Sequence, residues 1–166
     1  METLIIDATE QPIERPKKDQ KPCDSGKKKR HTLKTKIRMN DKGCIVLISK
    51  SHPSFVHDFN VFKEGKTSCE RIHCSYGFSG YQWIDAIHNN AHCPCKSSKN
   101  KHLDDGEKSY NQLLSSIHVA VEHVFAHIKT FRILSYPSYR NKRKRYNIKF
   151  RIIAGLVNLK NGFSFA

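Results

Sequence analysis

The chain has 166 residues, of which 30 are Lys or Arg and 15 are Asp or Glu, so its formal net charge is +15. This length suits one domain with a sizeable core. A mean hydropathy of -0.64 and the lack of an apolar run long enough to cross a bilayer argue against a membrane protein. The first residues do not resemble a signal peptide, so we expect a cytoplasmic protein whose six cysteines are reduced thiols.

Strand signals dominate the first third of the chain. The apolar run LIID, residues 4–7, predicts a buried strand that ends in Asp7. Residues 11–29 contain three prolines and many lysines, which predicts a loop. Residues 31–39 alternate in polarity, as expected for a strand with one solvated face. The turn sequence NDKG and the apolar residues 44–49 that follow it predict a hairpin.

Helices and short strands alternate in the rest of the chain. Apolar residues recur at helical spacing from Ser109 to beyond Lys129, which predicts a long amphipathic helix after a polar loop at residues 97–107. The other expected segments are short helices at 54–63 and 82–87, strands at 69–76 and 92–95, and a final apolar helix at 147–160. This order of elements predicts an α/β sheet covered by helices.

One side of the long helix carries a histidine, a carboxylate and a lysine. His118 precedes Glu122 by four residues and Lys129 follows it by seven, so all three share one side of the helix. A single Glu at the edge of a buried face is most often a surface residue. The functional interpretation gains weight from Asp7, because two carboxylates brought together across a sheet can bind Mg²⁺ or Mn²⁺ for phosphodiester cleavage.

Basic residues gather in two clusters. The segment Arg140–Arg151 has seven basic residues in twelve and no acid, and Lys27–Arg30 is a second block. Clustered positive charge predicts a polyanionic partner, nucleic acid above all, with a merely basic surface as the alternative. The candidate contact residues are Lys28, Lys29, Arg30, Arg140, Lys142, Arg143, Lys144 and Arg145.

Cysteines and histidines offer a second candidate metal site. Cys69, Cys74, Cys93 and Cys95 lie near His73 and His92, but C-x4-C and C-x-C are not the spacings of a standard zinc knuckle or ribbon. The helical pair His123 and His127 lacks the Glu of a zincin motif, so structural or solvent-facing roles are expected. A zinc-stabilised module remains an alternative interpretation.

Several segments together resemble a known family. LIIDATEQPIERPKK, SGKKKRHTLKTKI, VHDFNVFK, SGYQWI, VAVEHVFAHIKTFRIL and YRNKRKRYNIKFRIIAGLVN are similar to the catalytic domain of bacterial DDE transposases, over nearly the whole chain. The resemblance implies a ribonuclease H-like fold and metal-dependent strand cleavage and transfer at the DNA ends of insertion sequences. It assigns the first Asp and the Glu to Asp7 and Glu122, and a DNA contact near the cut to Lys129. Asp58 in VHDF is an accessory candidate.

The chain departs from the family pattern at several positions. Phe78-Ser79-Gly80-Tyr81 stands where such sequences carry D-S-G-Y, so the second catalytic Asp, which would bridge two metals, is replaced by an apolar ring. His118 and His127 stand where the family tends to have Arg, and Cys23 where it tends to have Tyr. The helical N-terminal region that recognises element ends is also absent, which suggests a truncated and decayed transposase.

Two functions of different classes follow from this resemblance. The first is a DDE endonuclease domain with impaired chemistry, in which Asp7 and Glu122 still hold Mg²⁺ or Mn²⁺ weakly. The second is a non-catalytic basic DNA-binding protein that interferes with intact transposase, by occupying element ends or by forming mixed oligomers. A homo-oligomer is compatible with either function. Only the first predicts divalent-ion binding that is lost in Asp7→Ala.

Overall fold

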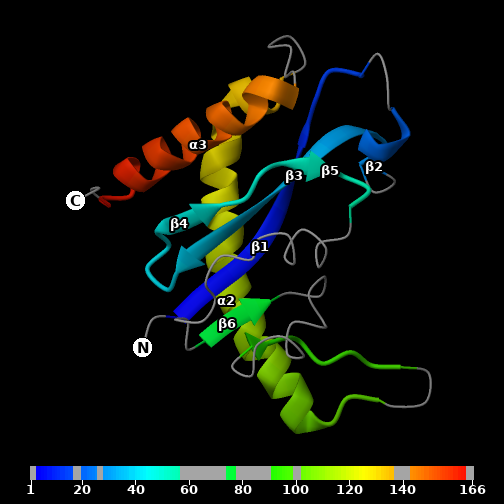
Figure 1. Ribbon diagram of the computed structural model, residues 1–166. Helices are drawn as coiled ribbons and strands as arrows, with labels where there is room; N and C mark the ends of the chain where they lie inside the picture. Colours follow the sequence, from blue (N-terminus) through cyan, green and yellow to red (C-terminus); the bar gives the residue numbers. More distant parts are fainter. Residues whose placement is uncertain are drawn as a thin grey trace.

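The described part of the chain forms a mixed sheet with two long helices packed on it (Figure 1). The computed structural model describes residues 3–16, 20–25, 28–56, 74–77, 91–98, 102–136 and 143–163. Among these residues, no helix has both the length and the apolar character that a membrane crossing requires. The expected α/β architecture is therefore confirmed.

Two long neighbouring strands form the centre of the sheet. Strand β1, Thr3–Pro12, pairs antiparallel with β3, Arg30–Asn40, and parallel with a short strand on its other side. Within the described residues, the strand order is β2-β3-β1-β6-β7, and β4 and β5 also pair with β3. The short strands are β2 at Asp24–Ser25, β4 at Ile45–Ile48, β5 at His52–Pro53, β6 at Cys74–Gly77 and β7 at Ala91–His92.

One face of the central strands forms the core. In the register of β1 and β3, Ile5 lies opposite Met39 and Asp7 opposite Ile37. Alternation along a strand therefore puts Asp7 on the same face as these buried apolar residues. Ile5, Ile37 and Met39 belong to the main hydrophobic cluster.

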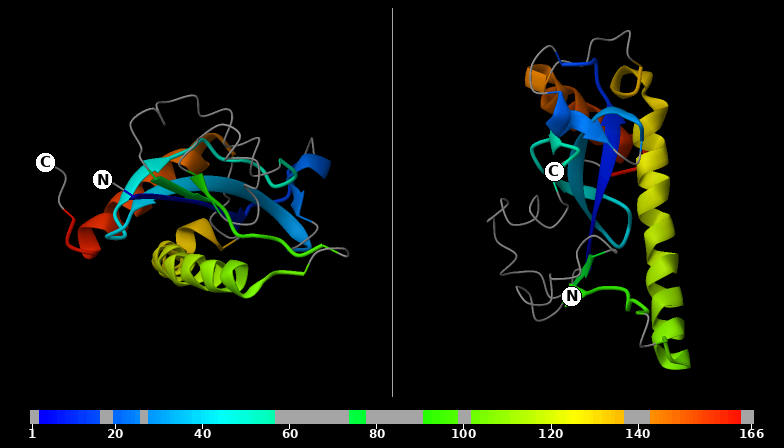
Figure 2. Two further views of the ribbon diagram at one scale, coloured as in Figure 1. Left: turned by 90° about the horizontal axis from the view of Figure 1, so that it is seen from below. Right: turned by 90° about the vertical axis from the view of Figure 1, so that its right-hand side faces the viewer.

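Helix α2, Asp105–Thr130, covers this face of the sheet (Figure 2). It contributes Val121, Val124, Phe125 and Ile128 to the same cluster. The helix begins with a capping box in which the Glu107 amide donates to Asp104 Oδ1 at 2.6 Å and the Asp104 amide donates to Glu107 Oε2 at 3.2 Å. This reciprocal pair satisfies amides that have no partner within the helix.

Helix α3, Arg143–Lys160, packs against α2 and β4. Tyr146, Phe150 and Val157 are fully buried on its inner side. Its Asn158 side chain is also buried, and it binds Ile45 through two hydrogen bonds of 2.8 Å, one to the amide and one to the carbonyl. The amide group thus satisfies the backbone of Ile45 in β4, joining the end of the chain to the sheet.

The structure corrects several predicted boundaries. Strand β1 continues to Pro12, and the segment expected to be a loop contains the short helix η1, Lys21–Cys23, and β2. Helix α2 begins within the segment predicted as a polar loop, and α3 begins four residues before its predicted start. The strand expected at 92–95 is limited to β7.

Other predictions fall partly or wholly outside the described residues. Residues 54–56 form a turn rather than the start of a helix, closed by the Val56 amide donating to the Pro53 carbonyl at 3.0 Å. The rest of that predicted helix, the helix at 82–87 and the first part of the strand at 69–76 are not described. A short helix η3, Arg132–Leu134, follows α2.

Candidate active site

Asp7 lies on the face of β1 that α2 covers. Its side chain is 18% exposed, and its Oδ1 accepts a hydrogen bond from the Ala8 amide at 2.7 Å. The strand thus holds the Asp7 carboxylate beside the helix.

Helix α2 presents Glu122 at the edge of its buried face. The neighbouring Val121 is fully buried, whereas the Glu122 side chain is 64% exposed. Successive helical residues point about 100° apart, so a carboxylate next to a core residue lies at the border between core and solvent. Glu122 is therefore accessible from solution.

His118 connects the two predicted acids. Its Nδ1 is 4.0 Å from Asp7 Oδ2 and its Nε2 is 3.4 Å from Glu122 Oε1. The imidazole thus lies between a carboxylate from the start of the chain and one from its last third. The sequence placed His118 one turn before Glu122, but its contact with Asp7 depends on the packing of α2 against β1.

The two carboxylates face different nitrogens of the same ring. This arrangement places the ring between the acids, rather than all three groups around one point. Within the described part of the chain, no group of three or more His, Cys, Asp or Glu side chains is arranged to hold a metal ion. The oxygen donors of Asp7 and Glu122 nevertheless fit the preference of Mg²⁺ and Mn²⁺ for hard ligands.

Lys129 lies on α2 beyond the acids. It is exposed, and its Nζ lies 6.0 Å from the centroid of the Phe125 ring. Seven residues of helix separate it from Glu122, which corresponds to about 10 Å along the axis.

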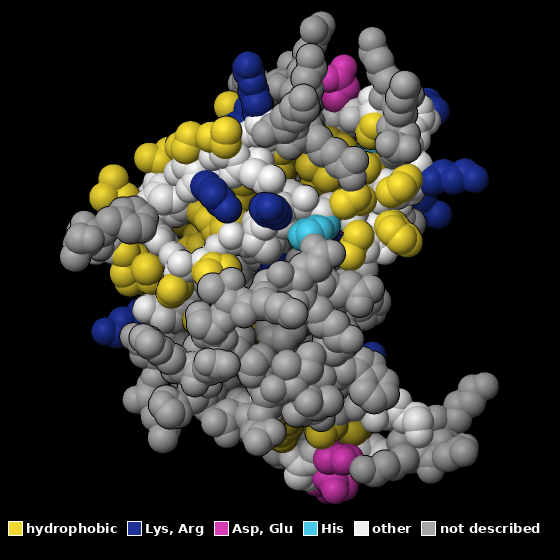
Figure 3. Space-filling model, viewed as in Figure 1, with side chains coloured by type: hydrophobic (Ala, Val, Ile, Leu, Met, Phe, Trp, Pro, Cys, Tyr) yellow, Lys and Arg dark blue, Asp and Glu magenta, His cyan; other side chains and the backbone are white. Residues whose placement is uncertain are grey.

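The remaining basic candidates lie at element ends. Lys28, Lys29 and Arg30 are exposed at the turn between β2 and β3, and Arg145 is exposed in the first turn of α3. Figure 3 shows Lys and Arg side chains projecting around the end of the molecule that carries β2. Arg143 and Lys144 belong to α3, but their side chains, like all of Arg140 and Lys142, lie outside what the structure describes.

Two further candidate positions also fall outside the described residues: Asp58 and Phe78. Of the predicted zinc ligands, Cys93 and Cys95 are of intermediate exposure. Cys69 and His73 are not described, and Cys74 is described only as backbone. On α2, His123 is exposed and His127 is half-buried.

Comparisons with known proteins extend over most of the chain. Residues 6–158 match a family described as "DDE superfamily endonuclease". The chain is also 37% identical over 155 residues to the probable transposase for insertion sequence element IS702 from Microchaete diplosiphon. That alignment covers 93% of this chain and 56% of the relative, so the chain spans about half the length of the curated relative it matches. No solved structure gives a significant match.

Proposed function

Because the chain belongs to the DDE superfamily endonuclease family, we propose that it is the catalytic domain of an insertion-sequence transposase with a ribonuclease H-like fold. The observation that carries this proposal is the meeting of Asp7 and Glu122 at His118. The two acids are 115 residues apart in the sequence, and both were assigned from the sequence to the same site. The substrate is DNA at the ends of an insertion sequence.

Asp7 and Glu122 are the residues that would hold a divalent cation, Mg²⁺ or Mn²⁺. The chemistry that such an ion supplies is Lewis-acid polarisation of the scissile phosphodiester. His118 contacts both carboxylates and restricts their orientation. Glu122 is on the exposed side of the pair, where a phosphate can approach from solution.

The basic residues would hold DNA through its phosphates. Lys129 is two turns beyond Glu122 on α2, and Lys28, Lys29, Arg30 and Arg145 are exposed at the ends of other elements. Arg140, Lys142, Arg143 and Lys144 extend the same positive segment of the sequence. Contacts of this kind position DNA without reading its sequence, and they weaken as salt rises.

Phe78 impairs the chemistry of this site. By the family resemblance it stands where the second catalytic Asp is expected, and a phenyl ring offers no ligand. Loss of an outer-shell partner alone costs about 10–100-fold in metal affinity or activity, and loss of a ligand costs more. Asp58 remains an accessory candidate. The proposed domain therefore binds the ion weakly and cuts poorly.

A second function is favoured by the net charge of +15. In this alternative the chain is a non-catalytic DNA-binding protein that interferes with intact transposase, by occupying element ends or by forming mixed oligomers. It shares salt-sensitive DNA binding with the first function. It does not require an ion at Asp7 and Glu122, and this difference separates the two.

Binding of Mn²⁺, followed by electron paramagnetic resonance, tests the choice. The endonuclease function predicts one weak site that is lost in both Asp7→Ala and Glu122→Ala. Asp41→Ala is the matched control, because Asp41 is an exposed acid in a hairpin turn and its removal changes the net charge equally. Equal Mn²⁺ binding by all four proteins would contradict the assigned site and leave the DNA-binding function.

A further inference from the structure

The turn between β2 and β3 contains a lysine in an unusual backbone conformation. Lys29 has φ of 52°, and it is the one non-glycine residue with positive φ among the residues described. The other positive values there belong to Gly43 and Gly162. Left-handed backbone crowds the Cβ atom of an L-residue, so glycine is the usual choice. The sequence keeps a lysine at a position that glycine would occupy with less strain.

Ser25 holds the backbone of this turn. Its carbonyl accepts a hydrogen bond from the Lys29 amide at 2.8 Å, and its Oγ accepts one from the Lys28 amide at 3.2 Å. Ser25 is itself buried. The conformation of both lysines is therefore tied to the position of one serine.

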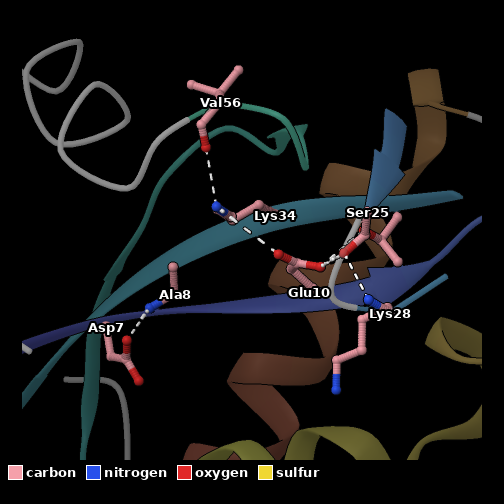
Figure 4. A network of polar contacts seen from close by, with 8 residues as sticks. Asp7, Ala8, Glu10, Ser25, Lys28, Lys34 and Val56 are labelled. Carbon is pink, nitrogen blue, oxygen red and sulfur yellow. Dashed lines mark hydrogen bonds and ion pairs between the residues drawn. The ribbon is translucent and has the colours of Figure 1, made fainter. Parts of the chain in front are cut away.

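Glu10 fixes that serine in place (Figure 4). The Ser25 hydroxyl donates to Glu10 Oε2 at 2.7 Å, and the Thr32 hydroxyl donates to the same oxygen at 3.1 Å. Lys34 Nζ lies 3.9 Å from Glu10 Oε1 and also donates to the Val56 carbonyl at 3.0 Å. The side chains of Lys34 and Glu10 are only 11% and 17% exposed. Hydrogen bonds to a carboxylate in such surroundings are among the stronger ones.

The turn beyond this network presents three consecutive cations. Lys28, Lys29 and Arg30 are all exposed, and none forms an ion pair within the described residues. The network uses a half-buried carboxylate to position a strained turn of exposed cations. The packing of the core does not require such a turn. The turn does suit a ligand of negative charge, because a preorganised cation loses less conformational entropy on binding.

We infer that Lys29 binds a DNA backbone phosphate and that Glu10 is the positioning residue that holds its turn through Ser25. This inference rests on the proposed DNA binding and deepens it. In this inference an acidic residue of a strongly basic protein strengthens the binding of DNA, although DNA is itself negatively charged. The negative charge of Glu10, taken alone, would weaken DNA binding.

The first test compares Lys29→Gly with Lys42→Gly. Both changes replace an exposed lysine of a turn by glycine, but Lys42 does not have positive φ. Lys29→Gly should raise the midpoint of thermal unfolding by about 2–4 °C through relief of strain. It should also weaken binding to a short random duplex several-fold and lower the slope of log affinity against log salt by about 0.9. Lys42→Gly should do neither.

The second test examines the positioning role. Glu10→Ala raises the net charge by one, so charge alone would tighten DNA binding, whereas loss of the acceptor should weaken it. Glu10→Gln keeps an oxygen acceptor and should restore most of the affinity, with circular dichroism confirming that each variant is folded. If Lys29→Gly matches Lys42→Gly, or if Glu10→Ala binds DNA more tightly, the inference is wrong while the proposed function stands. If the unaltered chain does not bind DNA, both are wrong.

Discussion

Strand β1 carries two carboxylates, three residues apart, that the molecule holds in different ways. Asp7 faces α2 and Glu10 faces the opposite side of the sheet (Figure 4). Both side chains are less than one-fifth exposed, at 18% and 17%. Glu10 accepts hydrogen bonds from two hydroxyl groups, whereas Asp7 accepts one from the Ala8 amide and its Oδ2 lies 4.0 Å from Nδ1 of His118.

The difference shows that two equally buried acids can have different surroundings. Glu10 is bound by neutral hydroxyls and a lysine that belong to neighbouring strands, so it supports the sheet and the basic turn. Asp7 faces a second acid, Glu122, through a single imidazole. Like charges brought close together repel, so a cation shared by Asp7 and Glu122 would stabilise the pair.

The largest expected effect is a difference in the free energy of unfolding between variants at Glu10 and at Asp7. Glu10→Ala should lower the free energy of unfolding by about 2–3 kcal/mol, because the buried hydroxyls of Ser25 and Thr32 lose their charged acceptor. Asp7→Ala should cost less, about 1 kcal/mol, because the hydrogen bond that it loses is with the adjacent Ala8 amide. Urea denaturation measures both values. Equal losses would remove the distinction between a structural and a functional acid.

The next effect concerns His118 and the binding of Mn²⁺. If the imidazole orients the two carboxylates, His118→Ala should weaken Mn²⁺ binding by about 10–100-fold. His123→Ala is the control, because His123 is an exposed histidine on the same helix. Tighter binding in His118→Ala would instead mean that the ring occupies the place of the ion.

The smallest effect concerns DNA. Lys129→Ala removes one phosphate contact and should lower the slope of log affinity against log salt by about 0.9, measured by fluorescence anisotropy. Lys108→Ala is the control at the other end of α2, where Lys108 pairs with Asp105 at 2.8 Å. Identical slopes for the two variants would place the DNA away from the end of α2 that carries Lys129.

The long elements of the fold were predictable because their apolar residues repeat strongly. The strand predicted at 31–39 agrees with β3 to within one residue at each end, and the long helix was predicted correctly at its end but four residues late at its start. The helix start was missed although Asp104 and Glu107 have the spacing of a capping box, a signal that the surrounding polar residues obscured. The second half of β1 was missed because Thr9 and Gln11 are polar yet buried beside β3.

The candidate site was predictable in its residues but not in its contacts. Asp7 and Glu122 could be assigned by family resemblance, and the helical spacing joined His118 to Glu122. The approach of His118 to Asp7 and the support of Lys29 by Glu10 depend on strand register and on helix packing. Neither leaves a periodic signal in the sequence.

The most direct test of the account is nicking of supercoiled plasmid in Mg²⁺ and Mn²⁺ by the unaltered chain and by Phe78→Asp. We predict that Phe78→Asp cuts far faster than the unaltered chain and that adding Glu122→Ala abolishes this activity. Cutting by the unaltered chain at the same rate would contradict the assignment of the second acid to position 78 and would direct attention to Asp58.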